Sequence, residues 1–222
     1  SRTGLAEVDA VETIPCAECG KPPGVCICDR VQTVNTKLRV VILQHPQEDD
    51  ALLGTAKLVE VTLAKAEIRV GLSGASLDHA LGARDANRER WAVLAAAKLP
   101  APVPDAARGD PVLVSDRKGR LRDRKRHGLE GLIVLDGTWS QAKTLWWRNP
   151  WLLKCRRLVL MPERPSAYGK LRRVPRRDSL STLESAALAL SVLEGDGGLY
   201  ERLTAPLRKL VQRATGNPSL AT

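Results

Sequence analysis

Aromatic residues are scarce in this chain of 222 residues. It has no Phe, two Tyr and five Trp, so its core must be built mainly from aliphatic side chains. No apolar run approaches the roughly 18 residues that a membrane-spanning helix needs. The first fifteen residues contain no apolar segment of a secretory signal, so we expect a cytoplasmic protein without membrane attachment. Neither G-x-G-x-x-G nor G-x-x-x-x-G-K-S/T occurs, so the common dinucleotide and P-loop fingerprints are missing.

Positive charge is in excess, with 35 Lys and Arg against 25 Asp and Glu, a net charge of +10 and a pI near 9.7. Such a balance indicates a polyanionic partner, although a general bias toward Arg and Ala would also produce it. Two dense runs favour the partner. The first contains Arg117, Lys118, Arg120, Arg122, Arg124, Lys125 and Arg126. The second extends from Lys154 to Arg177 and includes Lys170, Arg172, Arg173 and Arg176.

Four of the five cysteines fall within thirteen residues, in the segment CAECGKPPGVCICD. Cys16 and Cys19 form a C-x2-C pair, and Cys26 and Cys28 form a tighter C-x-C pair after a turn-rich linker. This arrangement predicts a structural zinc knuckle with four thiolate ligands. Disulfides, or a redox or iron–sulfur role, are the alternatives, and disulfides are disfavoured in a reducing compartment. We expect Cys155 to be a buried small residue.

Short apolar segments alternate with helical patterns after the cysteines, which predicts an α/β fold with a mostly parallel sheet covered by helices on both faces. Strands are expected at 37–44, 66–72, 111–116, 131–136 and 155–161. Helices are expected at 49–59, 86–99, 140–147, 179–195 and 200–215. The organisation expected from these patterns is a flexible segment at 1–13, a zinc knuckle at 14–36 and an α/β domain at 37–222.

The segment LDGTWSQAKTLWW, residues 135–147, places an acid at the end of an apolar strand, where open α/β sheets bind ligands. Gly137 permits a tight turn after Asp136, and Thr138 can cap the helix that follows. Taken locally, Asp136 could equally be a turn or helix-cap acid. Trp139 is expected to line a pocket or to pack in the core, and Trp146 and Trp147 to serve only packing.

Three further segments have polar residues at candidate element ends. Ser181 or Thr182 followed by Glu184 resembles a helix N-terminus, which suits an anionic ligand but also describes an ordinary cap. His45 and Glu48 follow a strand in QHPQE, where a histidine often only completes a turn. Tyr168, within YGKLRRVPRRD, offers a ring among arginines that suit phosphates.

The order of these elements resembles the DTW-domain family of tRNA-uridine aminocarboxypropyltransferases. The D-A/G-T-W element corresponds to residues 136–139, H-P-x-E to residues 45–48 and S-T-L-E to residues 181–184. The cysteine quartet precedes these three elements in the chain. Y-x-x-x-R-x-x-P, at residues 168–175, lies between D-A/G-T-W and S-T-L-E, as the order in the family requires. Gly54-Thr55 stands where the family usually has Asn-Thr, and Ser185 where it usually has Ala. The resemblance covers roughly residues 14–213.

This resemblance implies a SPOUT-like fold with a C-terminal knot. It also implies transfer of the 3-amino-3-carboxypropyl group of S-adenosylmethionine to N3 of a tRNA uridine, expected in the variable loop. The by-product is 5′-methylthioadenosine. Structural zinc and tRNA are the other expected components, and nothing in the sequence points to an obligate protein partner.

The resemblance also assigns roles to residues. Asp136 is expected to accept the uridine proton. The residues expected to bind the donor are Thr138, Trp139, Leu160, Pro162, Ser181, Thr182 and Glu184. Those expected to bind tRNA are His45, Glu48, Tyr168 and the two basic runs. The alternatives are an S-adenosylmethionine-dependent RNA methyltransferase, the same transfer onto ribosomal RNA, and a non-catalytic zinc-containing RNA-binding protein.

Overall fold

The computed structural model describes residues 14–48, 53–84, 86–94, 109–123, 125, 128–161, 166–167 and 180–216 of the chain. The segment 1–13, expected to be flexible, lies outside these residues. Within the described ranges, no helix has the length and apolar character required to cross a membrane.

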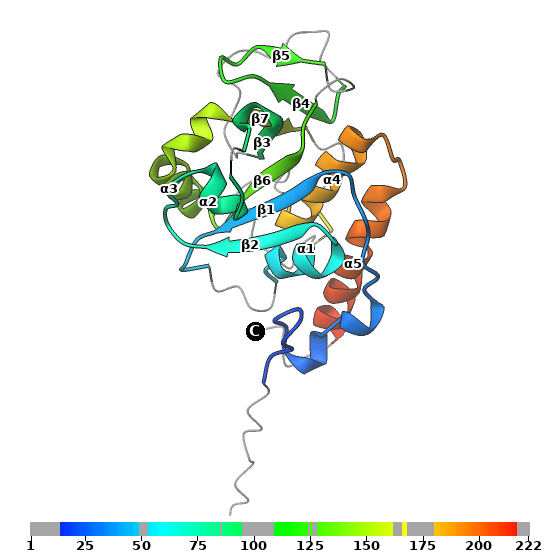
Figure 1. Cartoon of the computed structure of the whole chain (residues 1–222). Helices are drawn as coiled ribbons and strands as arrows, with labels where there is room; N and C mark the ends of the chain where they lie inside the picture. Colours follow the sequence, from blue (N-terminus) through cyan, green and yellow to red (C-terminus); the bar gives the residue numbers. More distant parts are fainter. Residues whose placement is uncertain are drawn as a thin grey trace, which may run out of the picture.

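A seven-stranded sheet forms the centre of the molecule, with the strand order β2-β1-β6-β3-β7-β4-β5. Its strands are β1 (Arg39–Gln44), β2 (Ala66–Val70), β3 (Trp91–Leu94), β4 (Val112–Ser115), β5 (Leu121–Arg122), β6 (Gly131–Asp136) and β7 (Arg156–Leu160). The first five strands in this order pair in parallel, whereas β4 runs antiparallel to both β7 and β5. The sheet is therefore mostly parallel, as expected, with an antiparallel hairpin at one edge (Figure 1).

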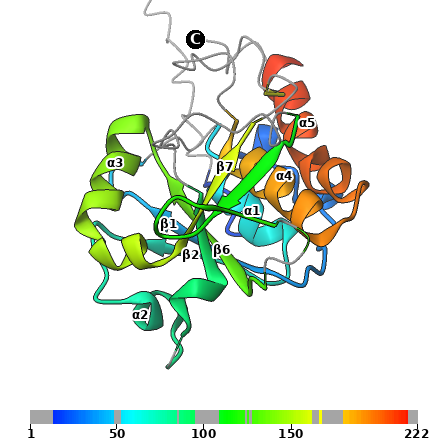
Figure 2. The same ribbon diagram turned by 90° about the horizontal axis from the view of Figure 1, so that it is seen from above.

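Helices cover both faces of this sheet (Figure 2). The α-helices are α1 (Ala56–Thr62), α2 (Leu77–Leu81), α3 (Trp139–Arg148), α4 (Thr182–Glu194) and α5 (Leu199–Gly216). Short 3-10 turns are η1 (Pro23–Val25), η2 (Cys28–Arg30), η3 (Arg88–Arg90) and η6 (Pro150–Lys154). One hydrophobic cluster joins α1, α4 and α5 to one sheet face, and a second joins α2, α3 and η6 to the other.

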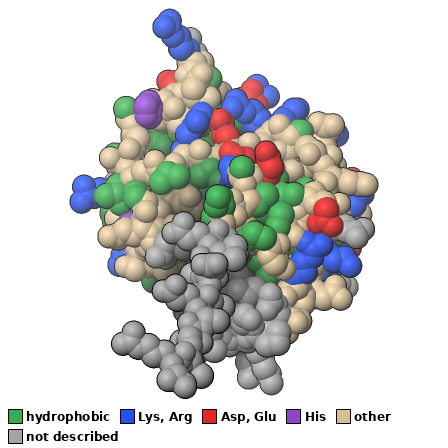
Figure 3. Space-filling model, turned by 90° about the horizontal axis from the view of Figure 1, so that it is seen from below, with side chains coloured by type: hydrophobic (Ala, Val, Ile, Leu, Met, Phe, Trp, Pro, Cys, Tyr) green, Lys and Arg blue, Asp and Glu red, His purple; other side chains and the backbone are tan. Residues whose placement is uncertain are grey.

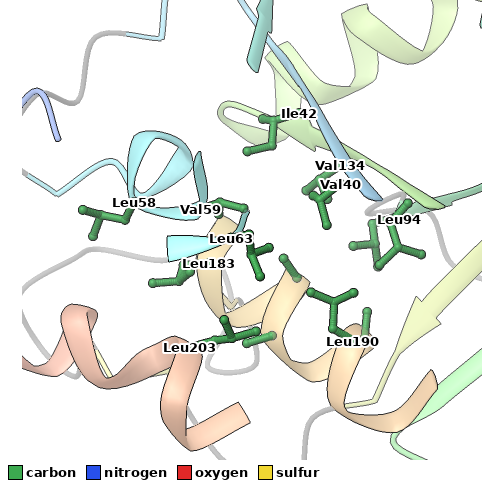
Figure 4. Packing of buried hydrophobic residues seen from close by; sticks show 14 of the residues in the cluster. Val40, Ile42, Leu58, Val59, Leu63, Leu94, Val134, Leu183, Leu190 and Leu203 are labelled. Atoms are coloured by element: carbon green, nitrogen blue, oxygen red, sulfur yellow. The ribbon is translucent and has the colours of Figure 1, made fainter. Parts of the chain in front are cut away.

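Alternation along the strands assigns their side chains to these two clusters. In β1, Val40 and Ile42 point toward α1 and α4, whereas Val41 and Leu43 point toward α2 and α3. Figure 4 shows part of the first cluster, in which aliphatic side chains of α1, α4 and α5 pack against those of β1, β3 and β6. The core is aliphatic on this side, as the scarcity of aromatic residues predicts.

The helix expected at 86–99 is wrong for its described part. Residues Trp91–Leu94 form β3, a fully buried strand between β6 and β7. The Ala-rich composition favours a helix locally, but burial of WAVL on both sheet faces outweighs that propensity. Gly131 of β6 makes room for this strand, because a Cβ atom there would lie 2.4 Å from the ring of Trp91. Residues 95–99 lie outside the described ranges.

The other expected strands and helices are present, with shifted ends. The helix expected at 49–59 begins only at Ala56, and the strand expected at 66–72 ends at Val70. The sequence patterns missed α2 and β5 and did not indicate the antiparallel direction of β4. The expected C-terminal knot depends on residues 162–165 and 168–179, which lie outside the described ranges, so it stays a prediction.

Candidate active site

The carboxyl ends of β1 and β6 bring two polar side chains together at one edge of the sheet. Gln44 is the last residue of β1 and Asp136 the last of β6, and the two are register partners. The amide Nε2 of Gln44 donates a hydrogen bond of 2.9 Å to Oδ2 of Asp136. Parallel pairing of buried strands thus creates a polar pair at the position where such sheets bind ligands.

Asp136 is held on its other side by α4. The hydroxyl of Thr182, the first residue of α4, donates to Oδ1 of Asp136. Asp136 is only 7% exposed, and its two side-chain hydrogen-bond donors within the described part of the chain are neutral groups. A carboxylate has about four acceptor positions, so these two hydrogen bonds leave it capacity to accept from a ligand.

Gly137 and Thr138 turn the chain from β6 into α3. The φ angle of Gly137 is +138°, and a Cβ atom there would lie 2.8 Å from Oε1 of Gln141, so a larger residue would disturb this turn. Thr138 and Gln141 form a capping box at the start of α3. Trp139 follows with its side chain 58% exposed, which excludes a role in the core.

The start of α4 is braced from several directions. The Ser181 hydroxyl accepts from the backbone N–H of Glu184, and the Thr55 hydroxyl accepts from that of Leu183. Glu184 is fully buried and accepts hydrogen bonds of 2.7 to 2.8 Å from the Ser166 hydroxyl and the backbone N–H groups of Ala167 and Ser181. These contacts fix the helix end that presents Thr182 to Asp136.

His45 and Glu48 lie in a turn directly beyond β1. The backbone N–H of His45 donates to the carbonyl of Asp136, and that of Glu48 donates to the carbonyl of His45. Nδ1 of the buried His45 accepts a hydrogen bond of 3.1 Å from the backbone N–H of Gln47. The imidazole therefore supports the turn next to the candidate site.

The first basic run lies at the opposite end of the strands from Asp136, where the parallel strands of the sheet begin. Arg117, Lys118 and Arg120 are in the turn between β4 and β5, and Arg122 ends β5. With Lys154 and Arg156 they line a hollow that also contains Glu89 and Asp116. Because β4 is antiparallel to β7, this turn lies about 20 Å from Asp136, estimated from strand spacing and rise. On the face seen in Figure 3, by contrast, basic and acidic side chains are interspersed.

Asp116 organises this turn. Burial would raise the pKa of its carboxyl, but hydrogen bonds from the backbone N–H groups of Arg120 and Lys118 and from the Arg120 guanidinium outweigh it and lower the pKa to about 2. Arg122 adds a contact of 2.8 Å to the same carboxylate. Asp116 thus holds the guanidinium groups of Arg120 and Arg122, and all three residues line the hollow.

The sulfur atoms of Cys16, Cys19, Cys26 and Cys28 lie within 4.8 Å of one another. The Cys16–Cys28 and Cys19–Cys26 sulfur distances are both 3.7 Å. Zn–S bonds of about 2.3 Å in a tetrahedron require S···S distances of about 3.8 Å, so the four sulfurs fit zinc. Backbone N–H groups of Cys19 and Glu18 lower the pKa of Cys16 to about 6, whereas burial raises that of Cys28.

This cysteine cluster is joined to the main core. Cys19, Val25 and Ile27 are buried in the same hydrophobic cluster as α4 and α5. The ammonium of the buried Lys21 donates to the carbonyl of Gly54, the residue before Thr55. The cluster is therefore connected, through Gly54 and Thr55, to the helix end that contacts Asp136.

Comparison with known proteins identifies the family to which this chain belongs. A family model described as the DTW domain matches residues 14–215. The chain belongs to the DTW domain family. The match includes the cysteine cluster, the turn after β1, the end of β6 and the start of α4, so the DTW domain comprises all parts of the candidate site.

Curated relatives of this DTW domain are named tRNA-uridine aminocarboxypropyltransferase 2. The chain is 27% identical to the protein of Macaca fascicularis, covering 88% of the chain and 61% of that relative. It is 28% identical to the protein of Mus musculus, covering 93% and 65%, and 30% identical to that of Drosophila melanogaster, covering 91% and 75%. It thus spans less than two thirds of the two mammalian relatives. No solved structure matches it.

Several expected site residues lie at this edge of the DTW domain. Thr182 contacts Asp136, Ser181 and Glu184 brace the helix start that carries Thr182, and Thr138 and Trp139 begin α3 directly after Asp136. The half-buried Leu160 ends β7 at the carboxyl end of the parallel strands. Other expected residues fall outside the described part of the chain: Pro162, Tyr168, Lys170, Arg172, Arg173, Arg176, Arg124 and Arg126. Lys125 is described and exposed.

Sequence reasoning missed two contacts and misjudged one side chain. It assigned no role to Gln44 or to Thr55, although Gln44 ends a buried strand just as Asp136 does, which could have indicated it. The packing role expected for Trp147 is wrong, because 69% of its side chain is exposed. Trp146 is half-buried, with the Arg157 guanidinium 5.7 Å from its ring centre, and Cys155 is buried as expected.

Proposed function

We propose that this DTW domain transfers the 3-amino-3-carboxypropyl group of S-adenosylmethionine to N3 of a tRNA uridine. The observation that carries the proposal is the buried Asp136 carboxylate at the carboxyl edge of the sheet, held by Gln44 and Thr182 and retaining free acceptor positions. The names of the relatives support the same chemistry, and the net charge of +10 suits an RNA substrate.

The proposed step is a displacement at the carbon of the aminocarboxypropyl group bonded to sulfur. N3 of the uridine forms a bond to this carbon, the C–S bond breaks, and its electron pair neutralises the sulfonium to give 5′-methylthioadenosine. The N3 proton passes to Asp136 as the new bond forms. Gln44 and Thr182 orient the carboxylate for this transfer, so little reorganisation is needed during the reaction.

The residues around Asp136 divide into a lining and a support. Thr138 and Leu160 are the proposed lining on the donor side, since they stand at the carboxyl ends of β6 and β7. Trp139, which is exposed at the start of α3, is assigned to the RNA side instead. The buried Glu184 already accepts three hydrogen bonds from this chain, so we assign it to positioning Thr182 rather than to the donor's ammonium group. His45 and Glu48 complete the turn that faces the site.

Zinc is proposed at Cys16, Cys19, Cys26 and Cys28, since the sulfur distances fit a tetrahedral ion. Four thiolates leave no open coordination position, so the metal would stabilise the fold and take no part in the reaction. A SPOUT-like knot after β7 and function in the cytoplasm complete the proposal, and both rest on the family resemblance.

The proposal is tested by incubating the chain with an unmodified tRNA transcript and S-adenosylmethionine labelled in its carboxyl carbon, followed by mass analysis of the nucleosides. We expect the carboxyl label in a uridine derivative that is heavier by the aminocarboxypropyl group. A nucleoside that gains only a methyl group would identify a methyltransferase. Unmodified tRNA that still binds the chain would favour the non-catalytic RNA-binding alternative.

A further inference from the structure

The outer face of α3 exposes two of the five tryptophans of this chain. Trp139 is 58% exposed and Trp147 is 69% exposed, whereas Trp91 and Trp151 are buried. Full exposure of an indole is unfavourable in water, because its large apolar surface remains hydrated. Two such side chains on one helix, in a chain with so few aromatic residues, indicate a surface that binds a ligand.

The positions of these residues form one stripe. Trp139, Lys143 and Trp147 are four residues apart, so each is rotated by about 40° from the last and all three share one side of the helix. Lys143 is exposed and lies at the midpoint. The Cα atoms of the two tryptophans are about 12 Å apart along the axis, at about 1.5 Å rise per residue.

Charge makes this stripe suitable for an anion. The ten residues of α3, WSQAKTLWWR, include Lys143 and Arg148 and no acid. Indole faces stack on nucleobases of any sequence, and a cation between them can contact the phosphate that joins two nucleotides. A second copy of this chain would fit poorly, because two identical stripes would place their lysines against each other.

The stripe is continuous with the candidate active site. α3 begins three residues after Asp136, so Trp139 stands beside the site and Trp147 lies two turns further along the helix. Figure 2 shows α3 on the flank of the molecule opposite α4 and α5, with no described helix outside it. A strand of RNA leaving the site along this flank would pass Trp139 first.

We propose that the outer face of α3 binds unpaired nucleotides adjacent to the target uridine. Their bases stack on Trp139 and Trp147, and the intervening phosphate contacts Lys143. This inference rests on the proposed function and deepens it by assigning a surface of this chain to the unpaired nucleotides that flank the target uridine.

The test compares Trp147→Ala, Trp147→Phe and Lys143→Ala with the wild-type chain in binding an unmodified tRNA transcript. Leu153→Ala is the matched control, because Leu153 is a 42% exposed apolar residue on η6. We expect Trp147→Ala to weaken binding about tenfold, Trp147→Phe to restore most of it, and Leu153→Ala to change it less than twofold. Lys143→Ala should reduce the slope of log affinity against log salt by about one.

Unchanged tRNA affinity of Trp147→Ala, in a variant that folds like the wild type, would overturn this inference. A change of sedimentation behaviour without loss of RNA affinity would also overturn it, since the face would then be an interface between copies. Product analysis separates the two proposals. Absence of aminocarboxypropyl transfer by the wild type would refute the proposed function, whereas transfer at the full wild-type rate by Trp147→Ala at low tRNA concentration would refute only the role of α3.

Discussion

Two aspartates of this chain follow buried strands of the same sheet, yet their surroundings differ completely. Asp136 ends β6 in LIVLDGTW, and Asp116 follows β4 in VLVSDRKG. Neutral donors of Gln44 and Thr182 contact Asp136. Asp116 instead accepts from two backbone N–H groups and from the guanidinium groups of Arg120 and Arg122.

Strand direction explains much of this difference. Asp136 lies at the carboxyl end of the parallel strands, where β1 also ends and α4 begins. Because β4 is antiparallel, Asp116 lies at the opposite edge and is neutralised inside a hairpin. The same local pattern therefore yields a carboxylate with remaining acceptor positions in one case and a structural clip in the other.

The largest effect is expected from Asp136→Asn. An amide cannot accept the uridine proton, so transfer at saturating tRNA should fall by about a hundredfold or more, the range of general-base contributions. Affinity for tRNA should change less than about threefold. Asp116→Asn is the matched control and should transfer at close to the wild-type rate. Equal transfer rates for Asp136→Asn and Asp116→Asn would contradict a specific role of Asp136 in the reaction.

Loss of the proposed zinc should destabilise the start of α4, which contacts Asp136, more than the hairpin that contains Asp116. Cys19→Ser should lower the melting temperature by about 10 °C or more, because metal binding and folding of the cysteine segment are coupled. Through Lys21, Gly54 and Thr55, it should also raise amide exchange at Leu183. Exchange in the hairpin at Arg120 should remain as in the wild type. Equal changes at both positions would show that the cysteine cluster stabilises the whole fold and has no particular connection to Asp136.

Removal of the Thr182 hydroxyl should have an intermediate effect. Thr182→Val keeps the shape of the side chain and leaves Oδ1 of Asp136 without its donor, so the rate should fall about tenfold. Thr182→Ser should recover most of the activity. A Thr182→Val variant as fast as the wild type would mean that this hydrogen bond does not position the carboxylate.

The smallest effect concerns Asp116. Its pKa is lowered to about 2, so its ionised form favours the folded state above about pH 4. This contribution is lost as the pH falls from about 4 toward 2. Asp116→Asn should therefore be less stable than the wild type at neutral pH, with the difference shrinking in acid, as thermal unfolding across pH would show. A difference independent of pH would indicate that charge is not what holds the hairpin.

The sequence predicted the local features of the site better than its spatial relations. The strand at 131–136 and the polar residues after it were apparent because an apolar run, an acid and a glycine follow in order. The contacts of Gln44 and Thr55 depend on pairing between segments far apart in the chain, which no local pattern reports. The basic run at 117–122 was expected to bind tRNA, but no local pattern showed that the antiparallel direction of β4 places it at the opposite end of the strands from Asp136.

The sequence predicted the wrong environment for two segments, one of which is more buried and the other more exposed than expected. WAVL at 91–94 lies in an Ala-rich segment that favours a helix, and only its position between β6 and β7 makes it a strand. Trp147 looked like a packing residue because tryptophan is usually buried, yet α3 turns it outward. Tertiary context decides both cases.

The central claim is that Asp136 accepts the N3 proton, and a tRNA transcript containing 5-fluorouridine tests it most directly. Fluorine at C5 makes N3–H more acidic, so a substrate of this kind depends less on a base. Single-turnover rates of the wild type and of Asp136→Asn should be measured on both transcripts. We expect the deficit of Asp136→Asn to shrink at least tenfold on the fluorinated transcript. The same deficit on both substrates would contradict a role for Asp136 in proton transfer.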